Sequence, residues 1–164
     1  MAVQSLLKPQ VKELLNKSIA SELYASNLYK YLANQMQRLG LFGCQKYFLK
    51  ESAEELTHYQ EIVDYINDLG DIADMPQVDA ISDMINGIGT ALNLAYETEK
   101  VLLYQYVEIY EQVEDEMEDC ITAQFLLKFI KIQRKAVGAY GDLISRLERN
   151  PTDVFMFDDY LGEK

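Results

Sequence analysis

The sequence contains a single histidine, His58, and only two cysteines, Cys44 and Cys120. One histidine excludes every metal or catalytic site that needs two imidazoles. The cysteines lie far apart and form no Cys-x-x-Cys pair, so the sequence supports neither a disulfide framework nor a zinc knuckle. We therefore expect both thiols to be reduced, as is usual for proteins of the cell interior.

Glycine, proline and long apolar runs are also scarce. Only 8 glycines and 3 prolines occur in 164 residues, of which 49% are hydrophobic and 26% are charged. This composition is typical of a helical globular protein. No apolar run approaches the roughly 18 residues that a membrane span needs, so no membrane association is expected. Residues 1–8 lack the charged and apolar regions of a signal peptide, and the sequence predicts a cytoplasmic location.

Basic residues are outnumbered by acidic ones. The chain has 15 Lys and Arg against 27 Asp and Glu, which gives a formal net charge of -12 at pH 7. A surface this acidic repels phosphate backbones, so nucleic acid is not an expected partner. The same field attracts cations.

Four long helices and one short helix are predicted within a single domain that covers residues 1–164. Pro9 suits the first turn of a helix, and Gly40 and Gly70 suit the ends of the first and second helices. The predicted helices cover about residues 9–38, 43–69, 88–116, 119–149 and 153–161.

The connections between the helices predict the topology. Short turns join the first helix to the second and the third to the fourth, so each pair is an antiparallel hairpin. A helix of this size is about 40 Å long, and the connection 71–87 can span roughly 55 Å when extended. The expected fold is therefore an all-α four-helix bundle with one long crossover between the second and third helices.

Each long helix carries an apolar stripe at alternating spacings of three and four residues. Polar residues interrupt each stripe near its middle, and these are Glu22, Glu55 with His58, Glu99 and Gln133. Mid-helix positions share one level in an assembled bundle. Three carboxylates and one imidazole are therefore expected to converge in the core.

Such a convergence is costly, because an unpaired buried carboxylate destabilises a fold by several kcal/mol. No stripe carries a Lys or Arg near its middle to neutralise the charge. Two divalent cations would compensate it, and carboxylates with one imidazole suit iron or manganese better than a closed zinc site. Glu55 and His58 are spaced i and i+3, so both can reach the same metal.

The same residues resemble motifs of the ferritin family over essentially the whole chain. Residues 22–29 look like the first ligand motif of that family, and residues 51–58 look like its most specific motif. Glu99 matches the ligand on the third helix, and Gln133 begins the Gln-x-x-Ala of the catalytically active heavy-chain type. Many di-iron bundles contain two Glu-x-x-His motifs, whereas this chain has one, which also favours the heavy-chain type.

The resemblance implies a ferroxidase centre that holds two iron ions per subunit. Glu55 would bridge the two ions, and Glu22 and His58 would complete the first iron site. Glu99 would bind the second iron. Gln133 would either bind that ion weakly or lie just outside its direct ligands, which leaves the second site weaker and more exchangeable.

Residues beside the centre also gain expected roles from the resemblance. Tyr29 is either a hydrogen-bonding electron donor next to the irons or an ordinary core tyrosine. Glu54 is either a remaining ligand of a third iron site, whose fourth-helix positions here hold Ile132 and Lys135, or only an inner-surface carboxylate. Leu56 stands where haem-binding bacterial ferritins have methionine, so no haem is expected.

The implied function is oxidation of Fe(II) by O2, with storage of Fe(III) as a mineral inside a shell of identical chains. The short helix 153–161 favours a shell of 24 chains over a mini-ferritin of twelve, which uses histidines of the first helix. Rubrerythrin-like enzymes usually repeat Glu-x-x-His on the fourth helix, and a non-catalytic bundle leaves three buried glutamates unexplained. Hydrogen peroxide as the oxidant and co-assembly with a second subunit type remain open.

Overall fold

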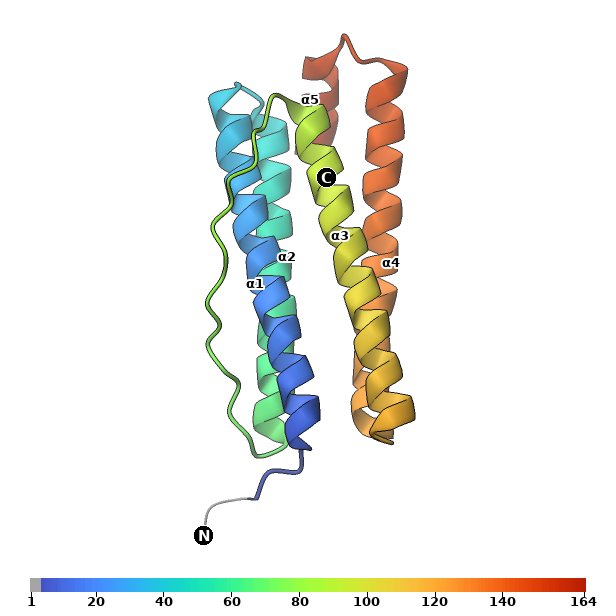
Figure 1. The fold of residues 1–164 in the computed structure, drawn as a ribbon. Coiled ribbons are helices and arrows are strands. Elements are labelled where there is room, and N and C mark those ends of the chain that lie inside the picture. Colours follow the sequence, from blue (N-terminus) through green and yellow to red (C-terminus); the bar gives the residue numbers. More distant parts are fainter. Residues whose placement is uncertain (1–3) are drawn as a thin grey trace.

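The computed structural model describes residues 4–164, which form helices and connections without any β-strand in that part of the chain (Figure 1). The predicted fold class, a four-helix bundle with one long crossover and a short fifth helix, is confirmed. Residues 1–3 lie outside the described residues. Two predictions extend to them, namely the domain 1–164 and the absence of signal-peptide features in residues 1–8. The elements are α1 (Pro9–Arg38), α2 (Phe42–Asp68), α3 (Ile88–Glu111), the π-helical turn η1 (Gln112–Glu116), α4 (Cys120–Arg149) and α5 (Val154–Gly162).

Local sequence signals set most of the helix ends. Pro9 occupies the first turn of α1, where its missing N–H costs nothing. Gly40 and Gly70 follow α1 and α2 with φ angles of 76° and 80°, a left-handed conformation that glycine adopts without strain. The Asp119 side chain accepts a hydrogen bond from the backbone N–H of Thr122 at 3.0 Å and caps α4.

The third helix differs from the prediction at its C-terminal end. The sequence predicts a helix to residue 116, but regular α-helix ends at Glu111 and the π-helical turn η1 continues to Glu116. The residues of this turn include Glu114 and Asp115. Negative charge at a helix C-terminus opposes the helix dipole, which accounts for the loss of regular helix here.

The crossover between α2 and α3 runs along the whole bundle beside α1, so that α2 and α3 are parallel (Figure 1). Hydrogen bonds attach it to α1 at several heights. Lys12 pairs with Asp71 at 2.7 Å, Asn16 donates to Asp74 at 2.8 Å, and the Tyr31 hydroxyl donates to the carbonyl of residue 83 at 2.9 Å. These contacts hold the crossover against α1 along its length.

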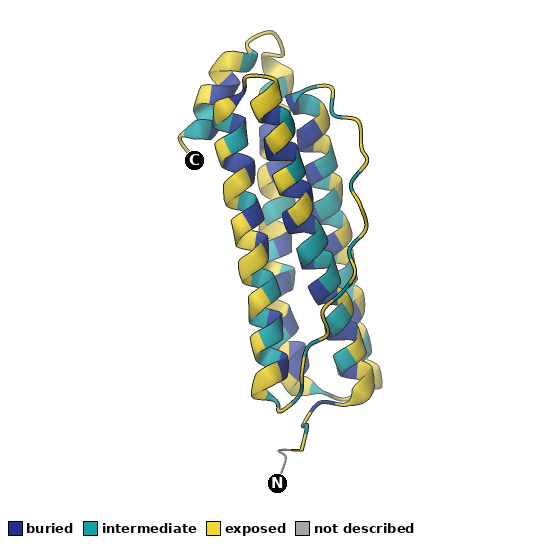
Figure 2. Ribbon diagram, turned by 90° about the vertical axis from the view of Figure 1, so that its left-hand side faces the viewer, coloured by how far each residue is buried: buried dark blue, intermediate teal, exposed yellow. Residues whose placement is uncertain are grey.

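Buried residues occur along the whole length of the bundle (Figure 2), and the hydrophobic ones form two clusters, one toward each end. One contains Leu32 and Phe48, and the other contains Leu15, Ile66 and Phe129. A buried polar layer lies between them, formed by Glu22, Glu55, Glu99 and Gln133. The interruption of the apolar stripes in the sequence is therefore a physical division of the core.

Helix α5 closes the end of the bundle where α2 begins. The Asp158 carboxylate accepts hydrogen bonds from the backbone N–H groups of Gly43 at 3.1 Å and Cys44 at 2.7 Å. Gly43 allows this close approach, because a Cβ atom there would lie 1.9 Å from the Asp158 carbonyl oxygen. Among the helices of residues 4–164, none combines the length and the apolarity needed to cross a membrane.

Candidate metal centre

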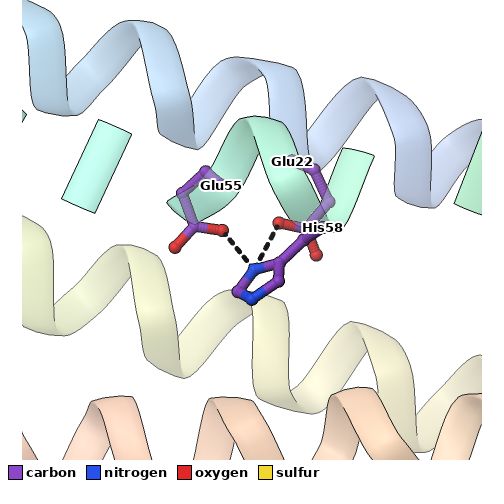
Figure 3. Close-up of side chains that lie close together, drawn as sticks. All are labelled: Glu22, Glu55 and His58. Carbon is purple, nitrogen blue, oxygen red and sulfur yellow. Dashed lines mark hydrogen bonds and ion pairs between the residues drawn. The ribbon is translucent and has the colours of Figure 1, made fainter. Parts of the chain in front are cut away.

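Three of the residues singled out in the sequence form a compact cluster between α1 and α2. Glu22 comes from α1, and Glu55 and His58 come from successive turns of α2, with one donor atom from each within 4.8 Å of the others. His58 Nδ1 lies 3.0 Å from Glu55 Oε2 and 3.7 Å from Glu22 Oε2. Figure 3 shows the imidazole of His58 directed toward both carboxylates.

The third expected carboxylate ligand, Glu99, reaches the same buried layer from α3. Its Oε1 accepts a hydrogen bond from the hydroxyl of Tyr29 on α1. Glu22 on α1 makes the equivalent contact in the opposite direction between the two helices. Its Oε1 accepts a hydrogen bond from the hydroxyl of Tyr106 on α3. Each of these two carboxylates keeps its Oε2 atom buried without a hydrogen-bond partner among the described residues.

Gln133 on α4 completes the layer. Its side chain is fully buried, and neither its amide oxygen nor its amide nitrogen has a hydrogen-bond partner in the described part of the chain. Buried polar atoms are normally hydrogen-bonded, so a group of such orphans in one layer demands an explanation. A bound cation would satisfy the orphan oxygens of Glu22, Glu99 and Gln133, whereas the amide nitrogen of Gln133 needs a hydrogen-bond acceptor.

Glu54 and Glu51 behave differently from the clustered residues. Glu54, predicted as a further metal ligand, is exposed on α2 and lies outside the three-residue cluster. Glu51 is half-buried and accepts a hydrogen bond from the Tyr140 hydroxyl at 3.0 Å.

The tyrosine partners Tyr106 and Tyr140 had no assigned role in the sequence, although a signal for them exists. The spacing of seven residues between Glu22 and Tyr29 recurs between Glu99 and Tyr106, and between Gln133 and Tyr140. Seven residues are two helical turns, so each polar residue and its tyrosine lie on the same face of their helix.

The buried carboxylates hold protons more tightly than exposed ones. Burial raises the pKa of Glu55 to about 9, and burial raises the pKa of Glu99 to about 7. Burial alone would lower the pKa of His58, but the nearby carboxylate of Glu22 and the hydrogen bond with Glu55 raise that pKa to about 10. Without a metal, the layer therefore keeps protons that a cation would displace.

The donor set fits divalent cations of intermediate hardness. Carboxylates with a single imidazole are typical ligands of iron and manganese. The orphan oxygens of Glu22 and Glu99 and the orphan amide of Gln133 supply free donor atoms in the layer. The geometry thus provides binding groups on α1, α2, α3 and α4 around one polar level of the bundle.

Comparison with known proteins places the chain among ferritins. The family model described as a ferritin-like domain matches residues 12–150. A probable bacterial non-heme ferritin-like protein of Haemophilus influenzae is 24% identical over 160 residues, covering 96% of each chain. A bacterial non-heme ferritin of Bacteroides fragilis is 24% identical, covering 97% of this chain and 100% of the relative.

The fold is also shared with solved ferritin structures. An open pore ferritin of the hyperthermophilic archaeon Archaeoglobus fulgidus superimposes with a TM-score of 0.92 at 22% sequence identity, covering 96% of this chain and 99% of that one. The match of the family model extends over most of the bundle, including all residues of the polar layer. This chain therefore belongs to the ferritin family.

Proposed function

We propose that the protein is a ferritin that oxidises Fe(II) with O2 at a paired iron site and stores the Fe(III) as a mineral inside a protein cage. The observation that carries this proposal is the buried polar layer. It contains three carboxylates, one imidazole and several unpartnered donor atoms, with no Lys or Arg in the layer to balance them. Bound cations compensate such a layer.

Each ligand has a distinct role in the proposal. Glu55 bridges two iron ions, and Glu22 and His58 complete the first iron site. Glu99 binds the second ion. Gln133, which is a neutral amide, holds that ion weakly, so iron can leave the second site after oxidation. Two resident ions per subunit are the expected occupancy during turnover.

The chemistry follows from holding two Fe(II) ions together. Each Fe(II) loses one electron, and O2 accepts both electrons with two protons from solvent to give H2O2. Fixing both ions beside one O2 molecule replaces an encounter of three species by a single binding event. Tyr29 is held by Glu99 beside this site, where it orients the carboxylate and can supply a further electron.

Large apolar side chains on the surface support assembly into a cage. Phe42, Phe155 and Met156 are 65%, 72% and 54% exposed, and all three lie near the end of the bundle closed by α5. Exposed apolar groups in a cluster mark protein contacts. We propose a homo-oligomer of 24 chains in the cytoplasm, which binds no haem.

The test is aerobic addition of two Fe(II) per chain to metal-free protein, with O2 uptake and ferric absorbance followed in time. Fast oxidation that saturates near two irons per chain is expected, and it is lost in Glu55→Ala. Glu108→Ala removes an exposed carboxylate of α3 and serves as the control. Oxidation by the wild type no faster than in buffer would overturn the proposal.

A further inference from the structure

A cavity of about 490 Å³ lies against the seam between α1 and α3, beneath the crossover. Helix α1 contributes Ser21 and Tyr24 to its lining, and α3 contributes Leu94, Val101 and Leu102. Crossover residues 77–79 form its remaining wall. The proposed chemistry of the metal centre gives this cavity no role.

The cavity lies at the same height along the bundle as the metal centre. The hydrogen bonds of Tyr29 with Glu99 and of Tyr106 with Glu22 set the register of α1 against α3. Ser21 directly precedes Glu22 in the chain, and Leu102 lies between Glu99 and Tyr106 on α3. The lining residues therefore come from the same stretches of both helices as the buried carboxylates.

Only a thin layer of side chains separates the cavity from the centre. Leu102 lines the cavity and is 3% exposed, so its side chain closes the inner end. Beside it, the Ser21 hydroxyl donates a hydrogen bond to the Gln105 side-chain oxygen at 2.8 Å, which links α1 and α3 across the seam. Leu102 and the Ser21–Gln105 hydrogen bond therefore lie between the cavity and the stretch of α3 that carries Glu99.

The opposite side of the centre has a different character. His58 reaches the surface on α2, with 14% of its side chain exposed, and the exposed carboxylate of Glu54 lies one turn away. A hydrated cation meets polar and acidic groups on that side. On the α1–α3 side, the acidic residues Asp79 and Glu97 are exposed at the rim, and the buried Leu102 lies at the inner end.

We propose that the cavity is the access path by which O2 reaches the metal centre, an inference that rests on the function proposed above. O2 is small, uncharged and apolar, so contact with aliphatic side chains favours it. A hydrated Fe(II) ion would have to lose water against Leu102, where the neutral side chains of Ser21 and Gln105 are hydrogen-bonded to each other, at a large free-energy cost. Glu97 at the cavity is already paired with Lys100 at 2.9 Å. The two substrates thus arrive from opposite sides.

Xenon provides a direct probe of the cavity, because it is an apolar gas that binds in apolar cavities. Crystals of the metal-free protein are exposed to xenon under pressure. A xenon atom between Leu94, Val101 and Leu102 is expected. The absence of xenon from this cavity would overturn the proposal, and this measurement does not depend on iron oxidation.

A filled variant provides the kinetic test. Val101 is 63% exposed at the cavity, so Val101→Trp can fill the space without disturbing the core. Leu127→Trp places the same side chain on α4, where Leu127 is 37% exposed, and serves as the control. At limiting O2, Val101→Trp is expected to oxidise Fe(II) roughly tenfold more slowly, equivalent to about 1.4 kcal/mol.

The expected change is specific for O2. The half-saturating O2 concentration rises in Val101→Trp, whereas the amount of Fe(II) bound without O2 equals that of the wild type and of Leu127→Trp. An unchanged O2 dependence in Val101→Trp would overturn the access path even though the wild type oxidises iron rapidly. Slow oxidation by the wild type itself is the separate result that overturns the proposed function.

Discussion

The Tyr29 hydroxyl on α1 donates a hydrogen bond to the Glu99 carboxylate on α3. The reverse contact, from Tyr106 on α3 to Glu22 on α1, makes the arrangement reciprocal across the seam. In each pair the tyrosine occupies one carboxylate oxygen and leaves the other oxygen free. The tyrosines therefore fix the orientation of two proposed ligands while keeping one donor atom of each available.

Removal of either hydroxyl is expected to destabilise the metal-free protein. In Tyr106→Phe, Oε1 of Glu22 loses its buried donor, which costs about 1 to 3 kcal/mol of unfolding free energy. The measurement is urea unfolding of the metal-free variant. Tyr104→Phe is the control, because Tyr104 is 64% exposed. Equal midpoints for the Tyr106 and Tyr104 variants would show that the hydrogen bond contributes nothing.

Substitution of a buried carboxylate is expected to stabilise the metal-free protein in a pH-dependent manner. The folded-state pKa of Glu99 is raised from 4.5 to about 7. The folded state therefore loses stability as pH rises from about 4.5 through 7, because the unfolded chain ionises first. Glu99→Gln removes this loss.

The gain from Glu99→Gln should thus be absent near pH 4 and reach a few kcal/mol above pH 7. Thermal unfolding of the metal-free wild type and variant across this range measures it. A gain of the same size at every pH would contradict the raised pKa. In the presence of divalent metal the order reverses, because the variant has lost a proposed ligand.

Metal binding is expected to release protons and to strengthen with pH. At pH 7, protons reside on the Glu55 and His58 pair, whose pKa values are raised to about 9 and about 10. A cation must displace them, so its apparent affinity rises between pH 6 and pH 8. Calorimetry of anaerobic Fe(II) binding in buffers of different ionisation enthalpy counts the protons. Binding without proton release would exclude this ligand set.

A methyl group at Gly43 is expected to displace α5. The added Cβ would lie 1.9 Å from the backbone carbonyl of Asp158, and the hydrogen bonds of the Asp158 side chain to Gly43 and Cys44 would be lost. Gly43→Ala should therefore increase amide exchange and proteolysis in Val154–Gly162. Gly138→Ala on α4 is the control.

The two glycines differ only in their surroundings. A Cβ at Gly138 meets nothing within 4 Å, and alanine favours a helix by roughly 1 kcal/mol over glycine. Gly138→Ala is therefore expected to leave α5 docked and to raise the melting temperature slightly. Normal protection of α5 in Gly43→Ala would show that the close approach is not required.

The sequence was sufficient for the fold because its signals are local. The stripes define four helices, Gly40 and Gly70 end two of them, and the crossover is long enough to return along the bundle. The π-helical turn after Glu111 was not predicted, since an apolar stripe does not report how acidic residues disturb a helix end.

The candidate site was predictable in its residue types but not in its pairings. Glu22, Glu55 and His58 interrupt apolar stripes at similar depth, and the structure brings them together. The contact of Tyr29 with Glu99 depends on the register of α1 against α3, which the apolar stripe of each single helix does not specify. Glu54 was expected either as a remaining ligand of a third iron site or as an inner-surface carboxylate, and it is exposed on α2 outside the cluster.

The division of the core into two apolar clusters has a consequence for how the bundle responds to its cargo. Hydrophobic contacts stabilise each end of the bundle. The middle depends on the protons or cations that compensate the charge of the buried carboxylates. The buried polar layer can therefore exchange protons for metal ions, and metal ions for protons, while both apolar clusters remain folded. A storage protein needs this property, because in every cycle of uptake metal ions bind to the polar layer and leave it again.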